Sequence, residues 1–274
     1  MKAVKKIGFA FIASILYTNL ISCSDNNGNE PEINIDNITT NEKQLVKITS
    51  TDDEGYTGEY IFSYDSKGRI ASITEKEYYD GETDTDITNF IWEENTIEAI
   101  NDYETTTFTI SGDLLYSGKS SDSDGCNYSF GYNSAKRLIS VDHWHSNYNY
   151  DTSTMNITWD EDKIIRITEE DEYYTEITNI TYSDKTCNGF FPFYSSLIED
   201  DITILWAQPE LGGIRNNNLP SIITEIDGDY ETIIEMTYTM DSNGYIASCT
   251  SKETESYNGK VEYIDTYVYK FTWK

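Results

Sequence analysis

Hydrophobic and polar residues alternate with a period of two in many short segments of this chain. In residues 60–64 (Tyr-Ile-Phe-Ser-Tyr), every second residue is aromatic, so the aromatic side chains lie on one face of an extended strand. Residues 65–68 follow as a turn, in which Gly68 supports a positive φ and the Asp65 side chain bonds nearby backbone. Residues 69–74 then return as a second strand. The stretch predicts a β-hairpin.

The same hairpin pattern recurs along the chain. Its clearest copies span residues 128–141 and 236–249, and looser copies span residues 90–97, 108–114 and 157–164. Internal similarity at intervals of about 20–50 residues marks a repeated unit that cannot bury its apolar face alone. Because the intervals are irregular, we predict one continuous antiparallel meander rather than a solenoid.

The number of strands predicts how the sheet is closed. We count about fourteen strands after residue 42, enough for one all-β domain with a large core. A sheet of that size curls or closes, because strands twist and free edges invite aggregation. A round barrel of this size would leave a lumen that side chains cannot fill. We therefore predict a flattened or occupied barrel built from a single antiparallel meander.

One insertion, at residues 184–218, breaks the alternation. Residues 190–194 (Phe-Phe-Pro-Phe-Tyr) are too apolar for an exposed loop. Residues 202–206 alternate as a short strand, although a helical turn through Leu197 to Leu205 also fits the sequence. We expect this loop or short-helix insertion to cover the core of the barrel.

The first residues predict export from the cytoplasm. A basic start and a short apolar run precede Leu20-Ile21-Ser22-Cys23, which looks like a bacterial lipobox. Residues 1–22 are thus expected to be a lipoprotein signal peptide, with Cys23 carrying the lipid. An ordinary signal peptide with an incidental cysteine is the alternative.

The next segment is polar and lacks aromatic residues. Residues 23–42 predict a flexible tether, which leaves residues 43–274 as the folded domain. Ser24 and Asp25 resemble the surface-export signal of lipoproteins in Bacteroidales. We therefore expect a lipid anchor in the outer membrane, on the cell surface rather than on the periplasmic side.

Two family resemblances rest on these motifs. The unit Tyr64-Asp65-x-x-Gly68-Arg69-Ile70 resembles the tyrosine-aspartate repeat of bacterial Rhs-type shell proteins. The whole chain is more similar to a family of Bacteroidales lipoproteins of unknown function, described as having a porin-like fold. The lipoprotein start, the hairpins, the segment at residues 218–220 and the aromatic final strand carry that likeness. It implies a porin-like barrel and supplies no catalytic residues.

The negative charge of the chain disfavours anionic binding partners. The formal net charge is −30, which repels nucleic acid and anionic headgroups. We expect contact with the membrane through the lipid anchor only, and a glycan or a protein as ligand.

Few residues predict a metal site. His143 and His145 point to the same side of a strand and are candidates to share a metal ion, while the adjacent Asp142 points to the opposite side. Because the chain has no third histidine, the alternative is that His143 and His145 are ordinary polar residues on a strand and bind no metal.

Calcium is the one cofactor that the sequence suggests. Asp122 and Asp124 could offer oxygen ligands to it, as could the acidic turn at residues 80–86. The alternative is that these acidic residues lie at hairpin tips, where water solvates them and no calcium is bound.

Five aromatic residues lie outside the repeated hairpin positions: Trp144, Tyr148, Tyr150, Tyr173 and Tyr174. They are candidates for a surface on which a ligand stacks, and the alternative is that they pack in the core. Cys126, Cys187 and Cys249 are expected to be buried structural thiols.

No catalytic set can be assigned from the sequence, and the first hypothesis is a lipid-anchored cell-envelope protein that binds or scaffolds. A glycan-processing enzyme is the second; it requires two converging carboxyl groups, one of them in an apolar site with a raised pKa. An integral outer-membrane barrel is the third, and it requires an apolar band facing lipid.

Overall fold

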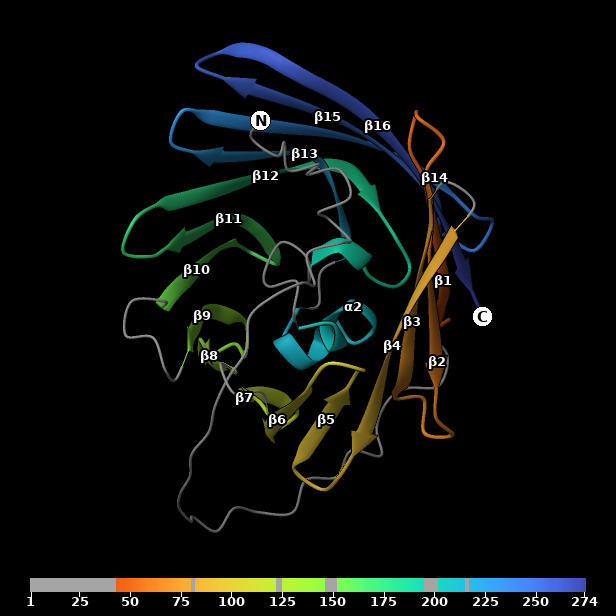
Figure 1. Ribbon diagram of the computed structural model, residues 1–274, viewed down its shortest axis with the longest axis vertical. Coiled ribbons are helices and arrows are strands. Elements are labelled where there is room, and N and C mark those ends of the chain that lie inside the picture. The colour runs from red at the N-terminus through yellow and green to blue at the C-terminus, as the bar shows by residue number, and fades with distance from the viewer. Residues whose placement is uncertain (1–42, 80–81, 122–124, 146–151, 195–201, 215–216) are drawn as a thin grey trace.

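The computed structural model describes residues 43–79, 82–121, 125–145, 152–194, 202–214 and 217–274. Within these ranges, sixteen antiparallel strands form one closed barrel (Figure 1). The all-β class, the single meander and the short-helix insertion are confirmed, whereas the prediction of about fourteen strands was two too few.

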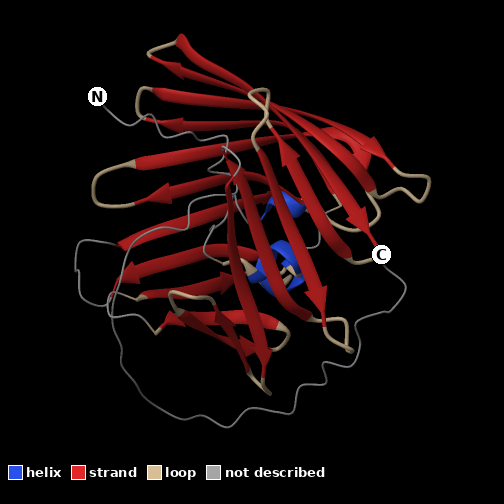
Figure 2. Ribbon diagram, turned by 45° about the vertical axis from the view of Figure 1, so that its right-hand side comes forward, coloured by secondary structure: helices blue, strands red, loops and turns tan. Residues whose placement is uncertain are grey.

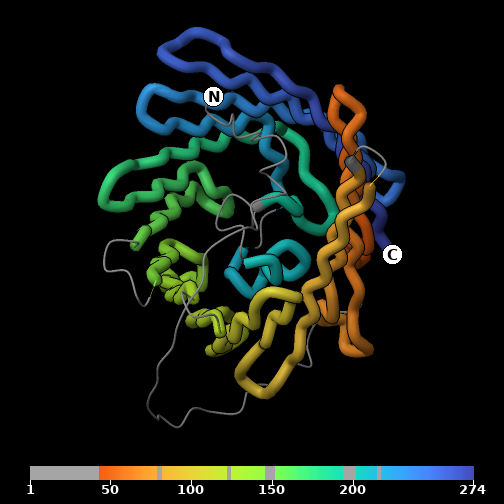
Figure 3. The backbone as a smooth tube through the Cα atoms, in the orientation of Figure 1, coloured from red at the N-terminus to blue at the C-terminus, as the bar shows by residue number. Residues whose placement is uncertain are grey.

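The strands follow one another around the barrel in chain order (Figure 3). The first eight are β1 (Leu45–Thr51), β2 (Thr57–Tyr64), β3 (Ile70–Tyr79), β4 (Glu82–Trp92), β5 (Thr96–Ile100), β6 (Thr105–Ser111), β7 (Leu114–Ser120) and β8 (Cys126–Tyr132). The second eight are β9 (Leu138–His145), β10 (Thr152–Asp160), β11 (Lys163–Glu170), β12 (Thr175–Thr186), β13 (Asn218–Asp227), β14 (Tyr230–Met240), β15 (Ile246–Tyr257) and β16 (Lys260–Trp273).

Because consecutive strands are antiparallel, their connections alternate between the two ends of the barrel. Connections after even-numbered strands lie at one end, which we call the insertion end, because the insertion follows β12. Connections after odd-numbered strands lie at the other end, the rim end. The barrel closes where β1 pairs with β16, and Gln44 and Lys274 exchange two backbone hydrogen bonds of 2.9 Å at the insertion end.

The inward faces of the strands carry the apolar positions of the sequence pattern. On β2, Tyr60 and Phe62 are buried inside the barrel, and Ser63, the next residue toward the turn, is exposed. On β15, buried Cys249 and Ser251 alternate with Thr250 and exposed Lys252. This alternation places one continuous apolar core in the lumen.

The repeated hairpin motif is explained by contacts at the insertion end. Aromatic residues at the ends of even-numbered strands donate hydrogen bonds of 2.6–2.8 Å to carbonyl oxygens at the starts of the preceding strands. The pairs are Tyr64 and Leu45, Trp92 and Ile70, Tyr132 and Leu115, Trp159 and Leu138, Tyr182 and Ile164, and Trp273 and Ile246. Each aromatic residue therefore ties its own strand to the strand before it.

The turn of the motif supports this arrangement. Asp65 accepts hydrogen bonds from the backbone N–H groups of Lys67 and Arg69, and Gly68 has a φ of +81°. The Arg69 guanidinium pairs with Asp65 and lies 5.0 Å from the centre of the Trp92 ring. Each polar position of the motif thus has a structural role at a turn.

The insertion between β12 and β13 lies inside the ring of strands (Figures 1 and 2). It contains η1 (Pro192–Tyr194), α2 (Ile204–Ala207) and η2 (Pro209–Gly212). Trp206 packs on Tyr60 with ring centroids 5.1 Å apart, and buried Gln208 accepts a 2.8 Å hydrogen bond from the backbone N–H of Ile70. The barrel is therefore occupied, as predicted.

Of the two interpretations of the segment around residues 202–206, the helical one is confirmed: residues 204–207 form a helix, whose side chains are buried all round against the barrel wall and the rest of the insertion. The expected acidic turn at residues 80–86 was wrong. Most of the acidic segment at residues 80–86 belongs to β4, which begins at Glu82 and pairs with β3. Among the described residues, no helix has the length and apolar character needed to cross a membrane.

Candidate functional site

The two ends of the barrel differ in how they hold aromatic side chains. At the insertion end, aromatic residues such as Tyr64, Trp92 and Trp273 donate hydrogen bonds to backbone carbonyls. The exposed aromatic residues of the described ranges are Tyr78, Tyr103, Tyr116, Trp144, Tyr173, Tyr174, Tyr230 and Tyr257. All of these except Tyr116 lie at or beside rim-end connections. We call these seven residues the tyrosine rim.

The tyrosine rim is well exposed. Tyr103 in the β5–β6 turn is 66% exposed, and Tyr173 in the β11–β12 turn is 77% exposed. Tyr230 and Tyr257 pair across β14 and β15 with ring centroids 4.7 Å apart. Aromatic faces that stay accessible at the tips of a rigid sheet are suited to stacking on a ligand.

The barrel interior near the rim end becomes acidic. Glu253 on β15 and Asp265 on β16 are register partners on the inward face, and only 2% and 3% of their surfaces are exposed. A small cavity beside Glu253 is lined mainly by apolar groups from Phe193, Ile234 and Met236. Glu253 is therefore a buried carboxyl group with an apolar wall.

These two carboxyl groups have opposite pKa shifts. Burial raises the pKa of Glu253 to about 7, and the charges of Glu255 and Asp265 add to this effect. Burial alone would also raise the pKa of Asp265, but hydrogen bonds donated by the Tyr267 and Tyr263 hydroxyl groups hold that pKa below its ordinary value. Tyr267 donates to Asp265 Oδ2 over 2.6 Å and stabilises the ionised form.

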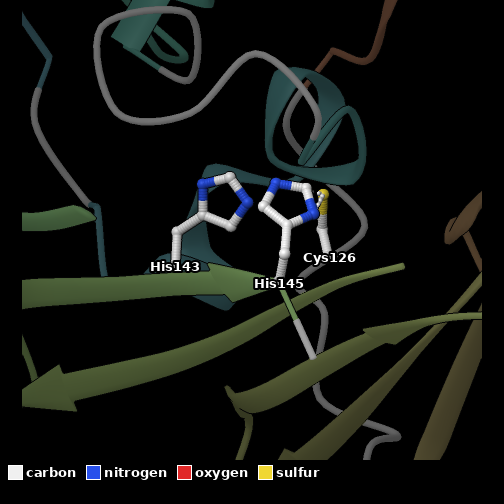
Figure 4. A group of neighbouring side chains, drawn as sticks. All are labelled: Cys126, His143 and His145. Atoms are coloured by element: carbon white, nitrogen blue, oxygen red, sulfur yellow. Dashed lines mark hydrogen bonds between the residues drawn. The ribbon is translucent and has the colours of Figure 1, made fainter. Parts of the chain in front are cut away.

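A second group of side chains lies inside the barrel at the ends of β8 and β9. Cys126, His143 and His145 place one sulfur and two imidazoles together, with ligand atoms all within 4.8 Å of one another. Figure 4 shows the three side chains on the same side of their strands. Asp142 faces outward instead, toward Ser129 and Thr154.

Sequence reasoning paired the two histidines but missed the cysteine as their neighbour. Counted outward from the turn at residues 133–137, Cys126 would fall opposite Trp144, but a β-bulge between Gly131 and Tyr132 shifts the register so that Cys126 pairs with His145. Its residue type alone had suggested a buried structural thiol, and residue type carries no information about register.

The other predicted site residues are spread over the rim end or lie outside the described residues. Trp144 on β9 is 37% exposed and Tyr174 is 43% exposed, and β10 and β11 separate them. Cys23, Asp122, Asp124, Tyr148 and Tyr150 lie outside the described residues.

The remaining cysteines sit in the core. Cys187 and Cys249 are 3% and 0% exposed, and burial raises the pKa of their thiols to about 11 and about 12. Neither thiol is suited to act as a nucleophile at neutral pH.

Comparison with known proteins reveals similarity of fold. The chain is similar to a porin-like protein from Bacteroides uniformis ATCC 8492, with a TM-score of 0.71, 16% sequence identity, and coverage of 85% of this chain and 98% of that chain. A porin-like protein from Bacteroides vulgatus ATCC 8482 matches with a TM-score of 0.61 and 14% identity, covering 85% of this chain and 99% of that chain. No protein-family model and no curated protein matches the chain. The expected porin-like fold is thereby confirmed.

Proposed function

We propose that this protein is a lipid-anchored barrel of the outer membrane that binds a neutral glycan through the tyrosine rim. The observation that carries the proposal is the asymmetry of the barrel, in which exposed aromatic residues gather at one end. Tyrosine rings stack on the apolar faces of sugars, and acidic groups accept hydrogen bonds from hydroxyl groups. The net charge of −30 disfavours an anionic polymer.

The position of the tether supports this function. Residue 43 lies at the insertion end, where the Lys43 backbone N–H donates to Tyr245 and the Lys43 ammonium pairs with Asp241 over 3.0 Å. A lipid on Cys23 would hold the protein by that end. The tyrosine rim would then face away from the membrane, toward a ligand outside the cell.

The strand faces argue against a transporting barrel within the membrane. A transmembrane barrel needs an apolar band facing lipid and a polar interior. Here the apolar core fills the lumen, and on the outward face of β16 Thr266 and Lys270 interrupt Ile264 and Val268. The protein is thus better suited to water on its outer surface.

A glycan-processing activity has less support. Glu253 and Asp265 have the opposite pKa shifts that acid and base catalysts need. However, both residues are almost wholly buried, and the cavity beside Glu253 is too small for a sugar ring. These two residues are better explained as part of the folded interior.

Replacing Tyr103 and Tyr173 together with Ala is expected to weaken glycan binding about tenfold or more, because two stacking contacts are lost. Binding is measured by affinity electrophoresis of the full-length protein in gels that contain starch, dextran, xylan or mannan. Tyr116→Ala is the matched control, because Tyr116 is 63% exposed but lies away from the rim. If none of the four polysaccharides retards the wild-type protein, glycan binding is the wrong function.

Replacing Cys23 with Ala is expected to abolish incorporation of a palmitate analogue and to move the protein into the soluble fraction. The reason is that the proposed anchor is the acyl group, whereas polar residues such as Thr266 and Lys270 interrupt the apolar ones on the outer face of β16. Metabolic labelling and carbonate extraction of membranes measure the two effects. A Cys23→Ala protein that still resists carbonate extraction would refute a barrel anchored by lipid alone.

A further inference from the structure

We propose that Cys126, His143 and His145 form a zinc-binding site inside the barrel, near the rim end. The chain has only two histidines and four cysteines. Folding brings both histidines and one of these cysteines to within 4.8 Å of one another. This site is independent of the glycan-binding function proposed above.

The strand register explains why the three side chains converge. Cys126 and His145 are partners across β8 and β9, and His143 is two residues from His145 on the same strand. Side chains two apart on a strand share a face, and directly opposed residues bring their side chains together. This face is the inward one, because Phe130 and Val141 on the same face are buried in the core.

The distances are close to those of a tetrahedral zinc site. With Zn–S near 2.3 Å and Zn–N near 2.0–2.1 Å, ligand atoms around one zinc ion lie about 3.3–3.6 Å apart. The Cys126 sulfur lies 3.8 Å from each ring nitrogen of His145, and the two imidazole centroids are 5.0 Å apart. Small side-chain rotations would bring all three ligands to one ion.

The surroundings suit a bound metal ion. Tyr128 is 2% exposed and stacks on His143 with ring centroids 5.1 Å apart and planes 18° apart, which restricts the orientation of that imidazole. His145 is 6% exposed. One sulfur and two imidazole nitrogens favour zinc over calcium or magnesium, which prefer oxygen ligands. Three protein ligands would leave a fourth position for water.

The test is a titration of the full-length protein, purified in detergent, stripped with a chelator and kept under a thiol reductant. Calorimetry is expected to show one equivalent of Zn²⁺ bound, with no binding of Ca²⁺ or Mg²⁺ at this site. Co²⁺ in place of zinc should give a thiolate-to-metal charge-transfer band in the near ultraviolet. Cys126→Ser and His145→Gln should each lower the zinc affinity by about 100-fold or more, because even outer-shell partners of a metal contribute about 10–100-fold.

Asp142→Asn is the matched control, since Asp142 is adjacent to His143 in sequence but faces outward. It should bind zinc with the affinity of the wild-type protein. Circular dichroism identifies variants that fail to fold, and His143→Gln then provides a further ligand variant. The proposal is overturned if the wild-type protein binds no stoichiometric zinc. It is equally overturned if folded Cys126→Ser retains wild-type affinity and the cobalt charge-transfer band.

Discussion

Replacing Phe191 with Ala is expected to lower the free energy of unfolding by about 3–5 kcal/mol. Phe191 belongs to the insertion and is only 1% exposed within the barrel. Its ring makes edge-to-face contacts with Phe193 and Tyr238, at centroid distances of 5.4 and 6.2 Å. Truncation removes apolar burial and leaves a cavity that strands on a closed barrel cannot collapse to fill. Denaturation by urea measures the change.

Tyr173→Ala provides the comparison, because that aromatic side chain is 77% exposed. Its effect on stability should stay within about 0.5 kcal/mol. A loss below about 1 kcal/mol for Phe191→Ala would mean that the insertion does not pack as part of the core.

Replacing Glu253 with Gln is expected to raise the free energy of unfolding at pH 8 by about 3 kcal/mol. The pKa of Glu253 is about 7 in the folded protein, against an ordinary value of 4.5. Between these values the folded state binds more protons than the unfolded state, so wild-type stability falls as the pH rises from 4.5 to 7. Glutamine keeps the shape of the neutral acid and has no charge to bury.

The same comparison at about pH 4 should give nearly equal stabilities, because Glu253 is then mostly protonated in both states of the wild-type protein. Urea denaturation at the two pH values measures both differences. Glu235→Gln is the control, since Glu235 lies on the outer surface and forms an exposed ion pair with Lys252 at 3.5 Å. Equal stability of Glu253→Gln and wild type at pH 8 would show that the Glu253 carboxylate is not desolvated.

The fold could be predicted from local features of the sequence. Alternation and turn chemistry are properties of a few adjacent residues, and in a meander each strand pairs with its neighbour along the chain. The motif from Tyr64 to Ile70 therefore predicted both a hairpin and its repetition. The turn expected at residues 80–86 was too long, because β4 begins at Glu82 and carries exposed Glu82 and half-buried Asp86 on the strand itself.

Most features of the candidate sites could not be predicted from the sequence, because they depend on which residues far apart in the chain lie side by side in the barrel. Glu253 lines a small cavity together with Phe193 of the insertion and with Ile234 and Met236 of the neighbouring strand β14, and the sequence pattern does not reveal this neighbourhood. The tyrosine rim requires knowledge of which connections share an end of the barrel. The pairing of Cys126 with His145 lies within a single hairpin, but it depends on a β-bulge between Gly131 and Tyr132 that the sequence pattern does not reveal.

The pairing of β1 with β16 means that the barrel can close only when the whole domain, from its first strand to its last, is available for folding. Gln44 finds its hydrogen-bonding partner, Lys274, only after the last residues of the domain have been made. Until then the growing sheet has two free edges, which are open to pairing with other chains. Closing a ring over more than about 200 residues also carries a large entropic cost and slows folding. The edges of β1 and β16 therefore stay open to pairing with other chains until these two strands meet.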